Sequence, residues 1–220
     1  MTRPLALVSL LSVVLISPTL ATDWGPYVGD AEFESIEASV LVTPAGVGPG
    51  LDEVHGSGGF ALDATIRIQV VDGNGQPIAG YPGEDIWLGF AVPGGTARGC
   101  RPDGGVPGGV FLADADTDAD GWTEFRLPLR GGGWSEGPAT LYLGGSPAHQ
   151  GPWFPMGHIP LRMNSPDING DLRVDLADVA LFAQDFYSGT APYRSDFFWD
   201  GQLDLADVVR FVPHLGEVCE

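Results

Sequence analysis

The sequence predicts an all-β sandwich followed by a small α-helical domain that begins near residue 165. The chain has 33 Gly and 19 Pro among 220 residues, which is usual for a β-protein rich in turns and high for a helical one. Several segments before residue 164 alternate apolar and polar residues, as half-buried strands do. Beyond residue 165 the apolar spacing becomes helical, and a 12-residue pattern occurs twice.

The charge balance limits the partners of the chain. There are 10 Lys+Arg against 29 Asp+Glu, and the formal net charge is −19 at pH 7. Such a chain lacks the basic face that binds nucleic-acid phosphates or an anionic membrane surface. So much carboxylate with so little basic charge indicates a cation as partner, and we expect calcium.

Residues 1–21 have the pattern of a secretory signal peptide. Arg3 supplies a positive charge, residues 5–16 are almost wholly apolar, and Thr19-Leu20-Ala21 offers small residues for cleavage near Ala21. The apolar run is shorter than the roughly 20 residues of a membrane span. We therefore expect a secreted or cell-surface protein without a membrane span.

Export changes what the two cysteines are expected to do. Cys100 and Cys219 would meet an oxidising compartment, where they are candidates for a disulfide. The alternatives are two free thiols or pairing with another chain. An internal bridge would tie the C-terminal tail to a loop of the middle region.

The sandwich is expected to comprise an N-terminal strand and Gly-rich segment at 22–59 and a main body at 60–164. Its clearest strand is 62–71, where Ala64, Ile66, Ile68 and Val70 alternate with polar residues before a Gly/Asn turn. Leu127 is expected on a buried face with Thr123, Phe125 and Leu129. The other expected strands are 33–43, 86–90, 122–129, 140–143 and 158–163.

Two stretches carry a family resemblance. Val70-Val-Asp-Gly-Asn-Gly-Gln-Pro-Ile-Ala-Gly80 is a strand, a turn and a Pro-containing strand start, and Thr117-Asp-Ala-Asp-Gly-Trp-Thr-Glu-Phe125 is a hairpin. Together they resemble the bacterial immunoglobulin-like (Ig-like) repeats of invasin- and intimin-type proteins, over roughly residues 60–163. The resemblance implies an Ig-like sandwich that serves as a spacer or adhesive surface, although the Gly-rich stretch 94–109 is longer than that pattern expects.

Asp114-Ala-Asp-Thr-Asp-Ala-Asp120-Gly121 places a carboxylate at every second residue before a Gly. This is like the first half of a calcium loop. Counting from Asp116, however, the twelfth position is Leu127, which supplies no carboxylate. We interpret the run as an acidic strand edge and hairpin turn.

Residues 165–220 contain an internal repeat with the spacing of a calcium loop. Asp167-Ile-Asn-Gly-Asp-Leu-Arg-Val-Asp-Leu-Ala-Asp178 aligns without gaps with Asp196-Phe-Phe-Trp-Asp-Gly-Gln-Leu-Asp-Leu-Ala-Asp207. A 12-residue calcium loop takes oxygens from positions 1, 3, 5, 7, 9 and 12. The candidate ligands of the first copy are Asp167, Asn169, Asp171, the carbonyl of Arg173, Asp175 and Asp178. Those of the second are Asp196, Asp200, the carbonyl of Gln202, Asp204 and Asp207, and Phe198 at position 3 predicts a weaker or degenerate site.

A short helix is expected after each loop. The apolar residues at helical spacing are Leu176, Val179, Ala180 and Ala183 in the first, and Leu205, Val208, Val209 and Val212 in the second, which Pro213 ends. No entering helix precedes either loop. This duplicated loop–helix unit resembles dockerin over about residues 166–216.

The resemblance to dockerin implies a calcium-stabilised fold that docks on a cohesin-type domain of a scaffold or surface protein. Such modules usually occur in polysaccharide-degrading assemblies. In the family, loop positions ten and eleven contribute to partner choice. Here they are Leu176 and Ala177, and Leu205 and Ala206, an apolar pair in place of the familiar hydroxyl-bearing one.

No catalytic constellation is recognisable in the sequence, so we expect a protein that is not an enzyme. The four histidines, His55, His149, His158 and His214, have no metal-site spacing, and Gly-x-Ser-x-Gly is absent.

The alternative is a carbohydrate-binding or adhesive sandwich whose calcium domain is only structural. Trp87, Trp122, Trp134 and Trp153 would then present their rings to sugars, although such rings more often fill a core. The aromatic residues near the second loop are likewise expected in a core: Phe186, Tyr187, Tyr193, Phe197, Phe198 and Trp199.

Overall fold

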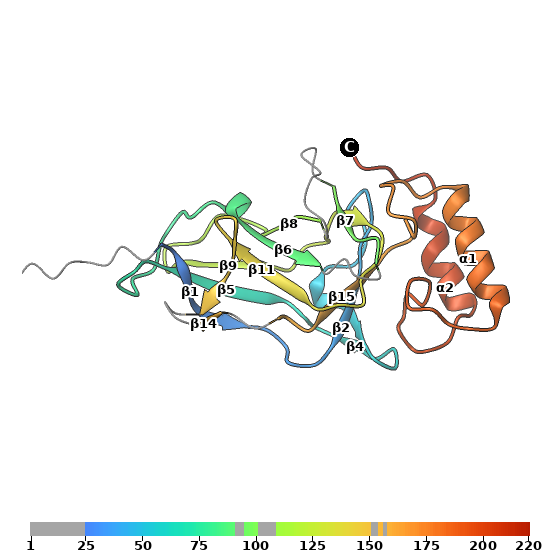
Figure 1. The fold of residues 1–220 in the computed structure, drawn as a ribbon, viewed down its shortest axis with the longest axis horizontal. Helices are drawn as coiled ribbons and strands as arrows, with labels where there is room; N and C mark the ends of the chain where they lie inside the picture. Colours follow the sequence, from blue (N-terminus) through green and yellow to red (C-terminus); the bar gives the residue numbers. More distant parts are fainter. Residues whose placement is uncertain (1–24, 91–94, 101–108, 151–153, 156–157) are drawn as a thin grey trace, which may run out of the picture.

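A computed structural model describes residues 25–90, 95–100, 109–150, 154–155 and 158–220 (Figure 1). A mostly β-sheet N-terminal region is followed by a short helical region, which lies at one end of the elongated molecule. The signal peptide expected at residues 1–21 and Trp153 lie outside the described residues. Within those residues, the structure contains no helix of the length and apolarity needed to cross a membrane.

The β-region is built from short strands joined by turns. They are β1 (Tyr27–Glu32), β2 (Ala38–Leu41), β3 (Val54–Gly56), β4 (Ala61–Leu62), β5 (Ile66–Val71), β6 (Ile86–Phe90), β7 (Arg98–Gly99), β8 (Phe111–Leu112), β9 (Trp122–Phe125), β10 (Gly131–Gly132), β11 (Ala139–Leu143), β12 (Ser146–Pro147), β13 (His149–Gln150), β14 (Phe154–Pro155) and β15 (Leu161–Asn164). Short 3₁₀ turns lie at η1 (Leu51–Glu53), η2 (Gly83–Asp85) and η3 (Val212–His214), and the helices are α1 (Leu176–Ser188) and α2 (Leu205–Phe211).

These strands form several sheets. The larger ones have the orders β14-β13-β1-β5-β9, β12-β11-β6-β8 and β15-β2-β3-β4, and β10 pairs with β7 in a ribbon. Pairing is antiparallel except between β1 and β13 and between β2 and β15. The two parallel pairs join strands far apart in the chain, which is the only way that parallel neighbours can be connected.

The period-two pattern predicts the buried face of β5 correctly, although the expected strand 62–71 is a strand only from Ile66 to Val71. Ile66, Ile68 and Val70 are at most 1% exposed, whereas Arg67 between them is exposed. β6 has the expected bounds, but the expected strand 33–43 is a strand only at its centre, as β2. Local alternation is therefore a reliable signal where a strand has one face on the core.

The prediction that Leu127 is buried is wrong, because its side chain is 59% exposed. β9 ends at Phe125, and Asp114 Oδ2 accepts hydrogen bonds from the backbone N–H groups of Arg126 (2.8 Å) and Leu127 (3.0 Å). These bonds replace ladder bonds and turn the chain out of the strand. The alternation therefore stops before Leu127.

The acidic run 114–121 forms bends and a turn before β9, as expected for a hairpin turn, but it contains no strand edge. Asp118 Oδ1 accepts hydrogen bonds from the N–H groups of Asp120 and Trp122, both at 2.9 Å. Asp116 Oδ1 accepts one from the N–H of Gly83 at 2.8 Å. Carboxylates of this run therefore accept hydrogen bonds from backbone N–H groups and stabilise the turn before β9.

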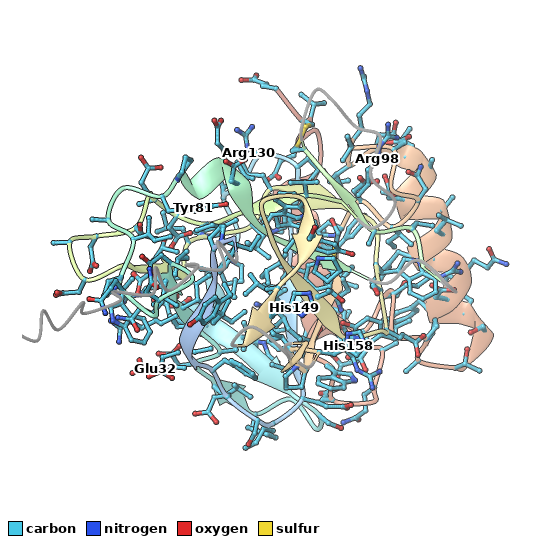
Figure 2. All side chains as sticks on the ribbon, turned by 60° about the vertical axis from the view of Figure 1, so that its left-hand side comes forward. Glu32, Tyr81, Arg98, Arg130, His149 and His158 are labelled. Carbon is cyan, nitrogen blue, oxygen red and sulfur yellow. A yellow bond between two sulfur atoms is a disulfide. The ribbon has the colours of Figure 1, made fainter. Side chains whose placement is uncertain are left out.

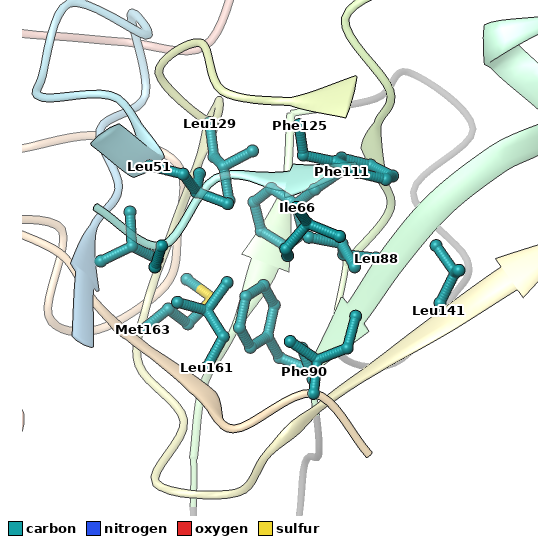
Figure 3. Packing of buried hydrophobic residues seen from close by; sticks show 14 of the residues in the cluster. Leu51, Ile66, Leu88, Phe90, Phe111, Phe125, Leu129, Leu141, Leu161 and Met163 are labelled. Carbon is teal, nitrogen blue, oxygen red and sulfur yellow. The ribbon is translucent and has the colours of Figure 1, made fainter. Parts of the chain in front are cut away.

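One hydrophobic core lies between the sheets (Figure 3). It combines side chains from the three larger sheets, among them Val40, Ile66, Leu88, Phe125 and Leu161. A second, smaller cluster underlies the helices and contains Leu41, Ile168, Val174, Phe182, Phe197 and Phe211. Because Leu41 belongs to β2, this cluster also packs the helical region onto the β-region.

Candidate metal centre

The two 12-residue loops, 167–178 and 196–207, have matching backbone conformations. Both have positive φ at positions 4 and 6: Gly170 (+73°) and Leu172 (+70°) in the first loop, Trp199 (+51°) and Gly201 (+80°) in the second. Leu172 and Trp199 are the only non-glycine residues with positive φ in the described chain. A left-handed conformation costs such a residue about 1–2 kcal/mol, so other contacts of the loops must stabilise it.

The carboxylate at position 1 supplies such contacts. Asp167 Oδ1 accepts hydrogen bonds from the N–H groups of Gly170 (3.0 Å) and Asp171 (3.1 Å), and Oδ2 accepts one from Leu172 (2.7 Å). In the second loop Asp196 accepts from the corresponding residues Asp200 (3.2 Å) and Gly201 (2.8 Å). Each loop is thus folded around its first carboxylate.

The carboxylate at position 12 links the first loop to its helix. Asp178 accepts hydrogen bonds from the N–H groups of Asn169 (3.1 Å) and Asp175 (2.9 Å). Asp175 is the N-cap of α1 and accepts from the N–H of Ala177 (2.7 Å), which completes a capping box. The helix therefore begins where the loop ends.

The second loop repeats this arrangement with its own residues. Asp207 accepts hydrogen bonds from the N–H groups of Phe197 (2.8 Å) and Asp204 (3.0 Å), and Asp204 caps α2 through the N–H of Ala206 (2.7 Å). The sequence repeat is thus also a structural repeat.

Four of the candidate ligands are buried carboxylates. Asp167 and Asp178 are fully buried, Asp196 and Asp207 are 2% exposed, and none of them belongs to an ion pair within the described residues. Burial, reinforced by neighbouring carboxylates, raises the pKa of Asp167 to about 7 and that of Asp196 to about 6. Burial also raises the pKa of Asp178 and Asp207. A cation in these loops would relieve this unfavourable burial of negative charge.

The remaining candidate ligands lie nearer the solvent. Asn169 is half-buried and its Nδ2 donates to Asp171 Oδ2 (3.2 Å); Asp171 and Asp175 are exposed. In the part of the chain that the structure describes, no three His, Cys, Asp or Glu side chains already converge as a metal site. Carboxylate, amide and carbonyl oxygens nonetheless form the donor set that Ca²⁺ prefers, so the first loop fits this ion chemically. The second loop keeps exposed Asp200, Gln202 and Asp204.

Phe198, at position 3 of the second loop, packs instead of ligating. Its ring meets His55 of β3 edge-to-face with centroids 5.0 Å apart, and the Arg210 guanidinium lies 4.7 Å from its centroid. The second loop thus has an aromatic contact with the β-region in place of one oxygen ligand.

Both loops face the β-region, a relation that the sequence did not predict. The N–H of Gly133 donates to the Asp167 carbonyl (2.6 Å), and Gly58 donates to the Trp199 carbonyl (2.8 Å). Buried Asn164, at the end of β15, donates through Nδ2 to the Asp196 carbonyl (2.8 Å).

An ion pair between buried Asp185 and half-buried Arg194 fixes the connection from α1 to the second loop. Arg194 binds both oxygens of Asp185 at 2.7 Å, and Ser195 Oγ donates to Oδ2 at 2.6 Å. Burial alone would raise the pKa of Asp185, but these hydrogen bonds outweigh it and hold the pKa below its usual value.

The proposed partner-binding pairs all lie on the surface. Leu176 is 81% and Leu205 is 72% exposed, and Ala177 and Ala206 are also exposed. The sequence did not single out Val209 for this surface, although it is 72% exposed one turn after Leu205. We call Leu176, Ala177, Leu205, Ala206 and Val209 the exposed apolar set. Exposed apolar side chains that gather into a patch are typical of interaction sites.

The aromatic residues near the second loop only partly follow the prediction. Tyr193 and Phe197 are buried, and Phe186, Phe198 and Trp199 are half-buried, but Tyr187 is 86% exposed. Tyr193 donates to or accepts from Ser39 of β2 at 2.7 Å, which ties the connection to the β-region.

The three described candidate tryptophans of the β-region, Trp87, Trp122 and Trp134, are half-buried and lie outside the hydrophobic core. The Trp87 ring stacks on that of Tyr142, with centroids 5.5 Å apart. The Arg67 guanidinium lies 5.1 Å from the Trp122 ring. The rings of Trp87 and Trp122 therefore already have a partner on one side.

The histidines have separate surroundings. His149 and His158 belong to the β-region (Figure 2), and His158 Nδ1 lies 3.2 Å from Thr140 Oγ1. His55 contacts Phe198, whereas His214 Nδ1 lies 2.8 Å from Glu217 Oε1 near the C-terminus.

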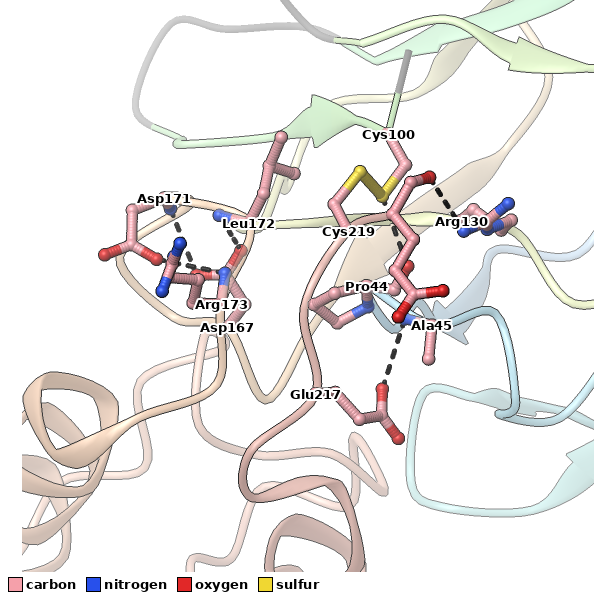
Figure 4. Close-up of a disulfide and its surroundings, with 11 residues drawn as sticks. Pro44, Ala45, Cys100, Arg130, Asp167, Asp171, Leu172, Arg173, Glu217 and Cys219 are labelled. Carbon is pink, nitrogen blue, oxygen red and sulfur yellow. Dashed lines mark hydrogen bonds between the residues drawn. A yellow bond between two sulfur atoms is a disulfide. The ribbon is translucent and has the colours of Figure 1, made fainter. Parts of the chain in front are cut away.

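Cys100 and Cys219 form a disulfide (Figure 4), as the sequence suggested. The bond joins the residue after β7 to the C-terminal tail.

Comparisons of the chain with protein-family models, with curated proteins and with solved structures find no match. The description of the two loops therefore rests on their ligand pattern and on their shared geometry.

Proposed function

We propose that this chain is a secreted, non-catalytic modular protein that binds Ca²⁺ and docks on a cohesin-type scaffold or surface protein. The observation that carries the proposal is the structural repeat of the two loops: each has the same backbone conformation, the same capping box and two buried carboxylates without an ion-pair partner among the described residues. Burying these carboxylates without a counter-charge lowers the stability of the fold, and a bound cation would compensate their charge.

In the first loop, calcium would be held by oxygens from every ligand position of the 12-residue pattern. These are Asp167, Asn169, Asp171, the Arg173 carbonyl, Asp175 and Asp178. The ion supplies the positive charge that the buried carboxylates lack. The second loop has one ligand fewer because of Phe198, so its site is weaker.

The exposed apolar set would form the docking face that receives the partner. Its apolar pairs start the two helices directly after the loops, so the same carboxylates that would bind calcium also cap these helices. Calcium would thereby hold the two helix starts in place. This explains how ion binding and docking are coupled in the proposal.

The β-region would serve as an Ig-like spacer or adhesive sandwich, within an assembly that degrades polysaccharides. Export is supported by the Cys100–Cys219 disulfide, since such bonds persist mainly in oxidising compartments.

A pull-down tests this function. The chain from residue 22 onward is immobilised and exposed to the envelope and secreted fractions of the host, with Ca²⁺ or with a chelator. One control bait carries Asp178→Asn with Asp207→Asn, and another carries Leu176→Asp with Leu205→Asp. We expect one specific protein to be retained by the native bait with calcium and by neither control. Retention that ignores both the chelator and the Leu variants would refute docking through this face.

The second candidate is a carbohydrate-binding or adhesive β-region with purely structural calcium. The contact of both loops with the β-region favours it, because calcium there would stabilise the joint between the two regions. A bait that binds calcium but retains no protein would support this candidate. Binding to insoluble polysaccharide that is lost in Trp134→Ala would then locate the ligand, and no retention on any polysaccharide would rule out carbohydrate.

A further inference from the structure

The C-terminal tail pairs with the first loop, and Figure 4 shows Cys219 of the tail near Leu172 of the loop. Residues 216–219 run antiparallel to residues 172–174: the N–H of Gly216 donates to the Val174 carbonyl (2.8 Å), Val174 donates to the Glu217 carbonyl (2.9 Å), and Cys219 donates to the Leu172 carbonyl (3.1 Å). These loop residues occupy positions 6 to 8 of the calcium pattern. The tail thus acts as a short strand added to the loop.

This pairing orients a candidate calcium ligand. Arg173 lies opposite Val218 in an antiparallel bridge. The hydrogen bonds of this bridge are made by the residues on either side of Arg173, Leu172 and Val174. In such a ladder the N–H and C=O groups of the middle residue point away from the partner strand. Accordingly, the Arg173 N–H donates to Asp171 Oδ1 (3.0 Å). The Arg173 carbonyl, the candidate ligand at position 7, therefore points away from the tail, to the same side as its N–H, which meets the candidate ligand Asp171.

The β-region holds the other end of the same loop. The Asp167 carbonyl accepts a hydrogen bond from Gly133, and Thr96 Oγ1 donates to the Ile168 carbonyl (3.1 Å). β10, next to Gly133, pairs with β7, which leads directly to Cys100. The disulfide to Cys219 therefore joins the two segments that hold the first loop.

We infer that the Cys100–Cys219 disulfide positions the first loop for calcium by fixing the tail against residues 172–174. The inference rests on the proposed calcium binding. Three further contacts involve the tail: His214 Nδ1 lies 2.8 Å from Glu217 Oε1, Glu217 Oε2 accepts from the N–H of Ala45 (3.3 Å), and Arg130 Nη2 donates to the Glu220 carbonyl (3.4 Å). The first lies within the C-terminal segment, and the two contacts with the β-region are long or exposed, so the disulfide is the strongest link between the tail and the β-region.

The second loop provides an internal control. Among the described residues, no backbone hydrogen bond from another segment reaches Gly201, Gln202 or Leu203, which occupy positions 6 to 8 there. Breaking the disulfide should therefore affect the first loop and leave the second unchanged.

The test is a calcium titration followed by the backbone amide signals of Gly170 and Gly201 in ¹⁵N-labelled protein. The native chain is compared with the Cys100→Ser and Cys219→Ser double variant, and with reduced, alkylated native protein. We expect the calcium affinity reported by Gly170 to fall about 10–100-fold, as for other groups that orient metal ligands. The response of Gly201 should change by less than about twofold. Reoxidation of reduced protein should restore the native affinity.

Equal losses at both loops would overturn the inference, since they would indicate general destabilisation, and so would an unchanged affinity at Gly170.

Amide hydrogen exchange of Val174 and of residue 219 in chelator separates this inference from the function proposed above. Faster exchange at both amides after the bond is broken supports the restraint itself, and unchanged exchange refutes it. A native chain in which neither glycine responds to calcium would refute the calcium assignment and, with it, the effect on affinity.

Discussion

Gly132 lies against the carboxylate of Asp167, and Gly132→Ala tests whether the β-region shapes the first loop. A Cβ atom at this position would lie 1.7 Å from Asp167 Oδ2, 2.6 Å from Cγ and 3.0 Å from Cβ. Carbon and oxygen atoms need about 3.5 Å, so the carboxylate would have to retreat by about 2 Å. The 2.7 Å hydrogen bond from Leu172 to Oδ2 would then break.

The cost of this retreat can be approximated from its parts. Overpacking a buried site costs about 1–3 kcal/mol, and losing a hydrogen bond to a charged acceptor costs about 1.5–3 kcal/mol. Because the surrounding atoms relax in part, we expect the free energy of unfolding to fall by about 2–4 kcal/mol. For a chain of this size that is a fall of about 5–15 °C in Tm.

Thermal and urea denaturation followed by circular dichroism would measure the loss, in chelator and in calcium. Gly25→Ala is the matched control, because a Cβ there meets no atom within 4 Å, and we expect a change of less than about 0.5 kcal/mol. The Gly132 variant should also bind calcium less tightly at the first loop. Native stability together with native calcium affinity would refute the contact between β10 and Asp167.

Three further changes test other parts of the structure. Asp178→Asn should lower calcium affinity more than Asp207→Asn, because only the first loop has an oxygen at every ligand position; equal losses in titration calorimetry would contradict this ranking. Asp185→Asn should cost about 1.5–3 kcal/mol in urea denaturation, since the hydrogen bonds from half-buried Arg194 to a charged acceptor are lost, and a loss below about 1 kcal/mol would show that the pair is dispensable. Asn164→Ala should cost about 1–3 kcal/mol by the same assay, because the buried Asp196 carbonyl loses its donor; native stability would mean that water replaces the amide.

The features that could be predicted are local in the chain. The alternation of Ile66, Ile68 and Val70 decides which side of β5 faces the core, because successive side chains of a strand point to opposite faces. The two helix starts follow from Asp175 and Asp204, whose side chains cap N–H groups two residues away. Leu127 shows the limit of this reasoning: one carboxylate from another segment, Asp114, ends the strand early.

The sequence by itself therefore determined the order of a β-region and a helical region, the repeat of the two loops and the positions of their candidate ligands. Only the tertiary structure decided how these parts meet. It placed Gly132 against Asp167, paired the tail with the first loop and closed the arrangement through Cys100 and Cys219. The reason is physical. Caps and alternation depend on residues a few positions apart, whereas the contacts between the regions join distant segments, and their geometry depends on how the whole core packs.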